Sequence, residues 1–96
     1  TVVGFRINPS ATGGDDSLYN VSRFAVFIST ATDAPADFVE VLSTLLDQRY
    51  RYTLYFELPE AVAEARYVRL ETRDTFGGRW HEVAEFTVCA AGPLGP

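Results

Sequence analysis

The chain of 96 residues contains no methionine and no lysine, and it has one cysteine and one histidine. Because Cys89 is alone, no internal disulfide can form, and the paired Cys and His spacings of a structural zinc site are absent. One histidine and one cysteine also provide no arrangement of nucleophile and base, so we predict that the chain is not an enzyme. The absence of an initiator methionine favours a processed product, an excised domain or a partial chain.

No apolar run approaches the ~18–20 residues that a membrane span needs, and no signal peptide is recognisable. Basic charge is also scarce, because 8 arginines face 13 acidic residues and give a net charge of −5. This balance argues against a nucleic-acid or anionic-membrane partner that is held by a broad basic surface. A local cluster of arginines remains compatible with it.

The residues that are present are those of a folded domain. Hydrophobic residues make up 47% of the chain and charged residues 22%, which argues against intrinsic disorder. A chain of this length forms one domain at most. Aromatic residues reach 14%, mostly Phe and Tyr, and favour β-strands. We therefore expect one β-rich domain over residues 1–90, followed by a linker or tail over residues 91–96.

Apolar side chains at every second position predict strands over residues 2–7, 20–29, 49–58, 66–73 and 81–89. Residues 37–46 fit either a short strand or a helix. Residues 20–29 carry apolar side chains on both faces, which is typical of a central strand that is covered on both sides. Pro59 is expected to end the strand before it, and residues 61–65 to form a connector, with one helical turn as an option. The spacing of these strands indicates an all-β sandwich or barrel.

The order of several segments carries a family resemblance. The second half contains Ala65-Arg66-Tyr67-Val68-Arg69-Leu70 and, after a glycine-containing loop, Trp80-His81-Glu82-Val83-Ala84-Glu85-Phe86-Thr87-Val88. The first half contains Val3-Gly4-Phe5-Arg6-Ile7-Asn8-Pro9, Val21-Ser22-Arg23-Phe24-Ala25-Val26-Phe27-Ile28-Ser29 and Phe38-Val39-Glu40-Val41. Across residues 2–89 this ordered set resembles the discoidin domain family, also called the coagulation factor 5/8 type C domains, which includes the family 32 carbohydrate-binding modules.

The resemblance implies an antiparallel jelly-roll β-sandwich of the galactose-binding type, with two sheets packed face to face. The family has further segments upstream of the matched region, so the resemblance implies the C-terminal two-thirds of such a sandwich. A sandwich that lacks strands exposes an edge and part of its apolar core. We therefore expect another chain or a further segment to complete it.

In carbohydrate-binding relatives, loops at one end of the sandwich hold the ligand, and the loop before the last strand supplies an aromatic side chain. An aromatic face suits the C–H groups of a sugar. The resemblance thus predicts Phe76, Arg79 and Trp80 as ligand contacts. In the alternative interpretation, Trp80 packs inward and caps the edge of the sandwich, and His81 begins the last strand.

The loop over residues 12–19 is the second candidate, and we expect Asp15 and the nearby Asn20 to bond ligand hydroxyls. The adjacent Asp15 and Asp16 also suggest a calcium loop, although exposed aspartate pairs are usually solvated. The resemblance implies a further calcium ligand at Glu85, because the glutamate of the family's Ala-Glu-Phe motif helps to hold a structural calcium. The alternative is an inward Glu85 that is paired with the backbone or an arginine.

Two further features have mainly structural interpretations. Arg66, Arg69 and Arg73 alternate with Glu71 and indicate a solvated or edge-protecting strand face, with a bidentate anion contact as the alternative. Cys89 lies near the place of the family's closing disulfide, but without a partner in the sequence we expect a buried small hydrophobe.

The function implied by the resemblance is a non-catalytic module, extracellular or at a cell surface, that binds carbohydrate or another cell-surface ligand in roles such as cell adhesion. No cofactor is certain, and calcium is the one candidate. The alternative function is a structural or assembly subunit of a filament, sheath, pilus or virion, which uses the sandwich for protein–protein contacts.

Overall fold

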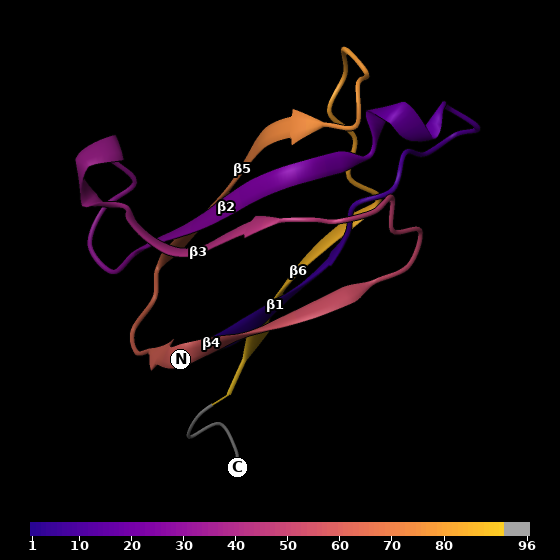
Figure 1. The fold of residues 1–96 in the computed structure, drawn as a ribbon. Coiled ribbons are helices and arrows are strands. Elements are labelled where there is room, and N and C mark those ends of the chain that lie inside the picture. The colour runs from indigo at the N-terminus through magenta and orange to yellow at the C-terminus, as the bar shows by residue number, and fades with distance from the viewer. Residues whose placement is uncertain (92–96) are drawn as a thin grey trace.

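The computed structural model describes residues 1–91, and within them six strands form two antiparallel sheets that face one another (Figure 1). One sheet has the strand order β4-β1-β6 and the other has the order β3-β2-β5. The strands are β1 (Val2–Asn8), β2 (Val21–Ser29), β3 (Val39–Leu45), β4 (Leu54–Val62), β5 (Tyr67–Thr75) and β6 (Glu85–Ala90), and the 3-10 helices are η1 (Ser17–Tyr19) and η2 (Pro35–Asp37). The predicted all-β class is confirmed, and the ambiguous segment at 37–46 is a strand. Most of the predicted tail, residues 92–96, lies outside the described residues.

The core lies between the two sheets and is centred on their middle strands. Phe5 and Ile7 of β1 and Phe24 and Val26 of β2 are fully buried, as the period-2 pattern predicts. The ring of Phe24 meets the ring of Phe56 on β4 edge to face, with 5.6 Å between centroids, so this pair joins the two sheets. Each side chain buried in this way contributes about 1.5–3 kcal/mol to stability.

The outer face of β2 is covered by arginine side chains from β5. Ala25 on this face is fully buried and Phe27 is half-buried. The guanidinium carbon of Arg69 lies 4.4 Å from the centroid of the Phe27 ring and 4.8 Å from that of Phe38. Such stacking shields the rings while the charged group still reaches water. The prediction of a central β2 that is covered on both faces is therefore confirmed. The prediction that the arginine face of β5 is solvated is wrong for Arg69, because this side chain covers two phenylalanine rings.

The prediction for the strand before Pro59 is wrong at both ends, because the strand covers Leu54–Val62 rather than residues 49–58. It continues through Pro59 because β4 is an edge strand, where a missing N–H removes no ladder bond on the open side. A bulge absorbs the irregularity, since Glu57 pairs with Gly4 and the next pairing joins Val62 to Val2. The suggested helical turn at 61–65 is also wrong, and Glu64 there has a φ of 57°.

The last strand begins at Glu85 rather than at about His81. Residues 81–84 belong to the preceding loop, which is fastened by an isolated bridge between Glu82 and Asn20. Cys89 lies on β6 as a half-buried free cysteine. In the described part of the chain, no helix has the length and apolar character needed to cross a membrane.

Candidate functional site

Three loops meet at one end of the sandwich (Figure 1), over residues 9–20, 46–53 and 76–84. The first and third loops are joined through the main chain, because the Gly78 N–H donates to the Leu18 carbonyl at 3.0 Å. The first and second loops are joined by side chains, because Nη1 of Arg49 donates to Oγ of Ser17 at 3.0 Å. The two loops that the sequence singled out thus lie side by side, together with a loop that it did not predict.

Asn20 connects all three loops, although it was predicted as a ligand contact. Its side chain is buried, with the residue 1% exposed. Its Oδ1 accepts from the Ala11 N–H at 2.7 Å, and its Nδ2 donates to the Tyr50 carbonyl at 3.3 Å. Its own carbonyl accepts from the Phe76 N–H at 3.3 Å. These bonds give Asn20 a positioning role, which the sequence did not predict.

Gly78 allows the third loop to approach the first. A Cβ at this position would lie 2.1 Å from Cδ1 of Tyr19 and 2.8 Å from the Leu18 carbonyl oxygen, so only glycine fits without displacing the neighbouring loop. This close contact presents the next two residues, Arg79 and Trp80, on the outside of the loop end. Trp80 is 62% exposed, and the alternative in which it packs inward is therefore wrong.

Phe76 and His81 have contacts within the protein. Phe76 is half-buried and packs against the core, and the guanidinium carbon of Arg49 lies 5.9 Å from the centroid of its ring. The His81 Nδ1 lies 2.9 Å from Oγ1 of Thr72. Of the predicted aromatic contacts, Trp80 is therefore the one that is free to stack on a ligand, while Phe76 supports the loop.

A polar cavity of about 290 Å³ lies at this end. Its lining contains one carboxylate, one guanidinium, one amide and two hydroxyls among Ser10, Ala11, Gly14, Asp15, Ser17, Asn20 and Arg51. The predicted Asp15 and Asn20 thus share one cavity. Hydroxyl, carboxylate and guanidinium groups supply both the donors and the acceptors that a polyhydroxylated ligand requires.

Arg51 and its neighbour Tyr52 also belong to this end, although neither was predicted from the sequence. Tyr52 is 58% exposed, and its ring meets the Tyr50 ring edge to face at 5.5 Å between centroids. Both fell in a segment whose alternation predicted a strand. Positive charge was the signal that could have identified this loop. Two of the eight arginines, Arg49 and Arg51, fall within a stretch of three residues, although the chain as a whole is acidic. Arginine placed beside exposed tyrosine is typical of binding surfaces.

Two carboxyl groups meet beside the cavity. Glu82 raises the pKa of Asp15 above its usual range, because a protonated Asp15 can donate a hydrogen bond to the Glu82 carboxylate and because the negative charge of Glu82 disfavours a second carboxylate beside it. Oε1 of Glu82 accepts from the N–H and the hydroxyl of Thr12, at 3.4 and 3.1 Å. Oε2 of Glu82 is buried and has no hydrogen-bond partner among residues 1–91. The local charge therefore favours donors, such as ligand hydroxyls, over anions.

The residues do not fit the calcium that was considered from the sequence. Within the part of the chain that the structure describes, no three His, Cys, Asp or Glu residues gather as a metal site. Asp15 and Glu82 alone fall short of the six to eight oxygen ligands that calcium takes. Asp16 instead accepts from the Leu18 N–H at 2.9 Å and begins η1. Glu85 is exposed and accepts from the Thr53 hydroxyl at 3.5 Å, so the expectation that it points inward is wrong.

Comparison of the chain with models of protein families, with curated proteins and with solved structures found no match. The resemblance of residues 2–89 to the discoidin family remains a prediction, and the loop end is interpreted from its own chemistry.

Proposed function

We propose that this chain is a non-catalytic, extracellular binding module of jelly-roll type that holds a carbohydrate at the loop end. The observation that supports the proposal is the polar cavity of about 290 Å³, which has Asp15 and Arg51 in its lining. Sugars are recognised by such paired donors and acceptors together with an aromatic face on which the pyranose ring stacks.

Two exposed aromatic side chains belong to the loops that meet there. Tyr52 directly follows Arg51 in the second loop, and Trp80 lies in the third loop. The hydrogen bonds of the buried Asn20 side chain and the close contact at Gly78 hold these loops in place without a ligand. A preformed site loses less conformational entropy on binding, which suits a module whose single contacts are weak and whose avidity comes from multivalency.

A glycan array probed with the purified chain, followed by calorimetry with the strongest ligand, tests this proposal. We expect Arg51→Ala and Trp80→Ala each to weaken binding about tenfold, since one lost charged hydrogen bond or one lost stacking contact costs about 1.4 kcal/mol. Arg6→Ala and Tyr67→Ala are the matched controls, because both residues are exposed and lie on strands outside the three loops. The absence of any glycan ligand, or equal effects of the site and control variants, would reject the proposal.

The second candidate function is a subunit of an assembly. The observation that favours it is the exposure of apolar residues on an edge strand, with Val39 64% and Leu45 74% exposed. Exposed edges of this kind pair readily with other chains. In that case, substitutions on β3 would prevent assembly, whereas substitutions in the three loops would leave assembly unchanged.

A further inference from the structure

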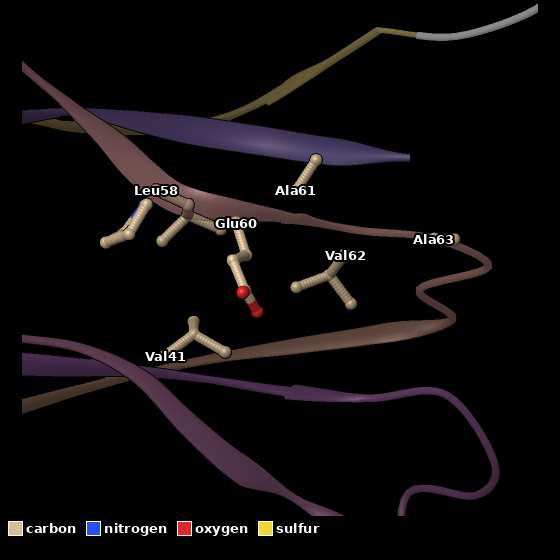
Figure 2. A pocket seen from close by; sticks show the side chains of 7 residues that line it. Val41, Leu58, Glu60, Ala61, Val62 and Ala63 are labelled. Carbon is tan, nitrogen blue, oxygen red and sulfur yellow. The ribbon is translucent and has the colours of Figure 1, made fainter.

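An apolar cleft runs between the two sheets on the side where β3 and β4 are the edge strands. Near one end of the cleft is a hollow of about 570 Å³, lined by Val41, Leu58, Pro59, Glu60, Ala61, Val62 and Ala63 (Figure 2). Near the other end is a hollow of about 280 Å³, lined by Thr44, Leu45, Leu46, Asp47, Tyr50, Leu54, Tyr55 and Phe56. The first hollow alone reaches the roughly 300–1,000 Å³ of ligand-sized clefts, so it has room for several side chains.

The β4 side of this cleft is closed to strand pairing. Pro59 has no N–H to donate, and the bulge between Glu57 and Val62 interrupts the ladder. The Glu60 side chain points from β4 into the space between the sheets (Figure 2). Prolines, bulges and inward charges are the devices by which edge strands avoid pairing with other chains.

The β3 side differs in that its seven residues, Val39–Leu45, include no proline and no glycine, and its pairing with β2 shifts register only once, between Val26 and Phe27. Among residues 1–91, β3 pairs with β2 on one side and its other edge is free. The strand is about 23 Å long at about 3.3 Å per residue, enough to pair with an extended segment of similar length. This contrast indicates that the β3 edge, rather than the β4 edge, accepts a partner strand.

The charge of Glu60 indicates the chemistry of that partner. The ion pairs of the described residues join Arg69 or Arg73 to Glu71 or Glu40, so Glu60 belongs to none of them. A carboxylate in an apolar cleft is costly once a partner excludes water, unless that partner brings a cation. The net charge of −5 also favours a basic partner, because it attracts positive charge over a longer range.

We propose that the free edge of β3 binds an extended strand of a partner protein, in which apolar side chains alternate with polar ones and one arginine or lysine faces Glu60. The strand extends the β3-β2-β5 sheet by main-chain hydrogen bonds. Its apolar side chains fill the cleft against Leu58 and Val62 of the opposite sheet. Main-chain pairing supplies affinity in this mode of recognition, and the side chains in the cleft supply specificity.

A synthetic peptide of nine residues tests the proposal, with valine alternating with threonine and an arginine at one of the valine positions. We expect the peptide to shift the NMR amide signals of β3 and to leave those of β5, the other edge of the same sheet, unchanged. Glu60→Arg should weaken binding about tenfold, because an attraction becomes a repulsion, and a peptide with glutamate in place of arginine should restore it. Glu57→Arg is the matched control, because it makes the same charge change at an exposed residue of the same strand that lines neither hollow.

Three results would overturn this proposal. The peptide fails to bind, or its shifts map to β5 or to the three loops. Glu60→Arg and Glu57→Arg weaken binding equally, so that long-range charge alone is at work. The chain without peptide sediments as a dimer with β3 amides that are protected from exchange, in which case a second copy is the occupant. Because Trp80→Ala leaves the β3 edge intact, peptide binding by that variant separates this proposal from the carbohydrate site.

Discussion

Replacing Asn20 with alanine should uncouple the three loops while leaving the strands intact. The change removes the bond from the Ala11 N–H, at 2.7 Å, and the bond to the Tyr50 carbonyl, at 3.3 Å. A protein hydrogen bond contributes about 0.5–1.5 kcal/mol net, and an unsatisfied buried partner costs about 1–3 kcal/mol. Because Ala11 and Tyr50 are only half-buried, water can replace part of each bond, and we expect a loss of about 2 kcal/mol.

Thermal and urea denaturation measure this loss, which corresponds to a fall in Tm of about 8–16 °C for a domain of this size. Asn8→Ala is the matched control, because the Asn8 side chain is also an acceptor, but only from Ser10, two residues away. Hydrogen exchange at the Gly78 amide reports the third loop, which Asn20 reaches only through its main chain, and we expect faster exchange in Asn20→Ala. The reasoning fails if Asn20→Ala loses no more stability than Asn8→Ala, or if exchange at Gly78 does not change.

Two further changes test the electrostatics of the fold. Because Glu82 raises the pKa of Asp15 in the folded chain, the contribution of Asp15 to stability is full below its unfolded pKa of about 3.9 and is lost as the pH rises through the raised folded pKa. Asp15→Asn should therefore raise the urea midpoint at pH 7 and change it little at pH 3, and an equal change at both pH values would contradict this cause. Arg69→Ala should lower stability by about 1–2 kcal/mol by uncovering two phenylalanine rings, with Arg69→Lys intermediate. An Arg69→Lys variant as stable as the unchanged chain would exclude stacking of the planar guanidinium as the cause.

The sequence predicted those parts of the fold in which burial and alternation agree. On β2, inward Phe24 and Val26 sit in the centre of a sheet, and the strand is found where the pattern placed it. On β5, Val68 and Leu70 pack against the core and Arg69 lies on the other face, as expected from period 2. A central strand has neighbours on both edges and a covered inner face, so its own residues carry enough information to locate it.

Edge strands and loops could not be predicted in the same way, because their structure depends on distant residues. Tyr50 and Tyr52 alternate with arginines as a strand would, yet the segment is a loop in which Tyr50 accepts from Nδ2 of Asn20, thirty residues away. The same tyrosine donates its hydroxyl to Asp47 at 2.7 Å, which favours a local turn. Such long-range bonds leave no periodic trace, so Arg51 was missed although it lines the cavity that contains the predicted Asp15.

The loop end and the open side of the sandwich are stabilised by different means. At the loop end, the loops are held by the main-chain bond from Gly78 to Leu18 and by the bonds of the buried Asn20 side chain. The donor and the acceptor of each of these bonds lie within residues 1–91, so no further strand is needed to hold the loops. On the open side, Val41 and Val62 line a cleft, and the neighbouring edge of β3 pairs with no other strand among residues 1–91. Polar groups that are paired within the chain make a rigid, preformed site, whereas an apolar cleft beside an unpaired edge gains stability only when a partner covers it. The proposed carbohydrate site at the loop end and the proposed partner edge at β3 are therefore stabilised independently, and a change at one need not disturb the other.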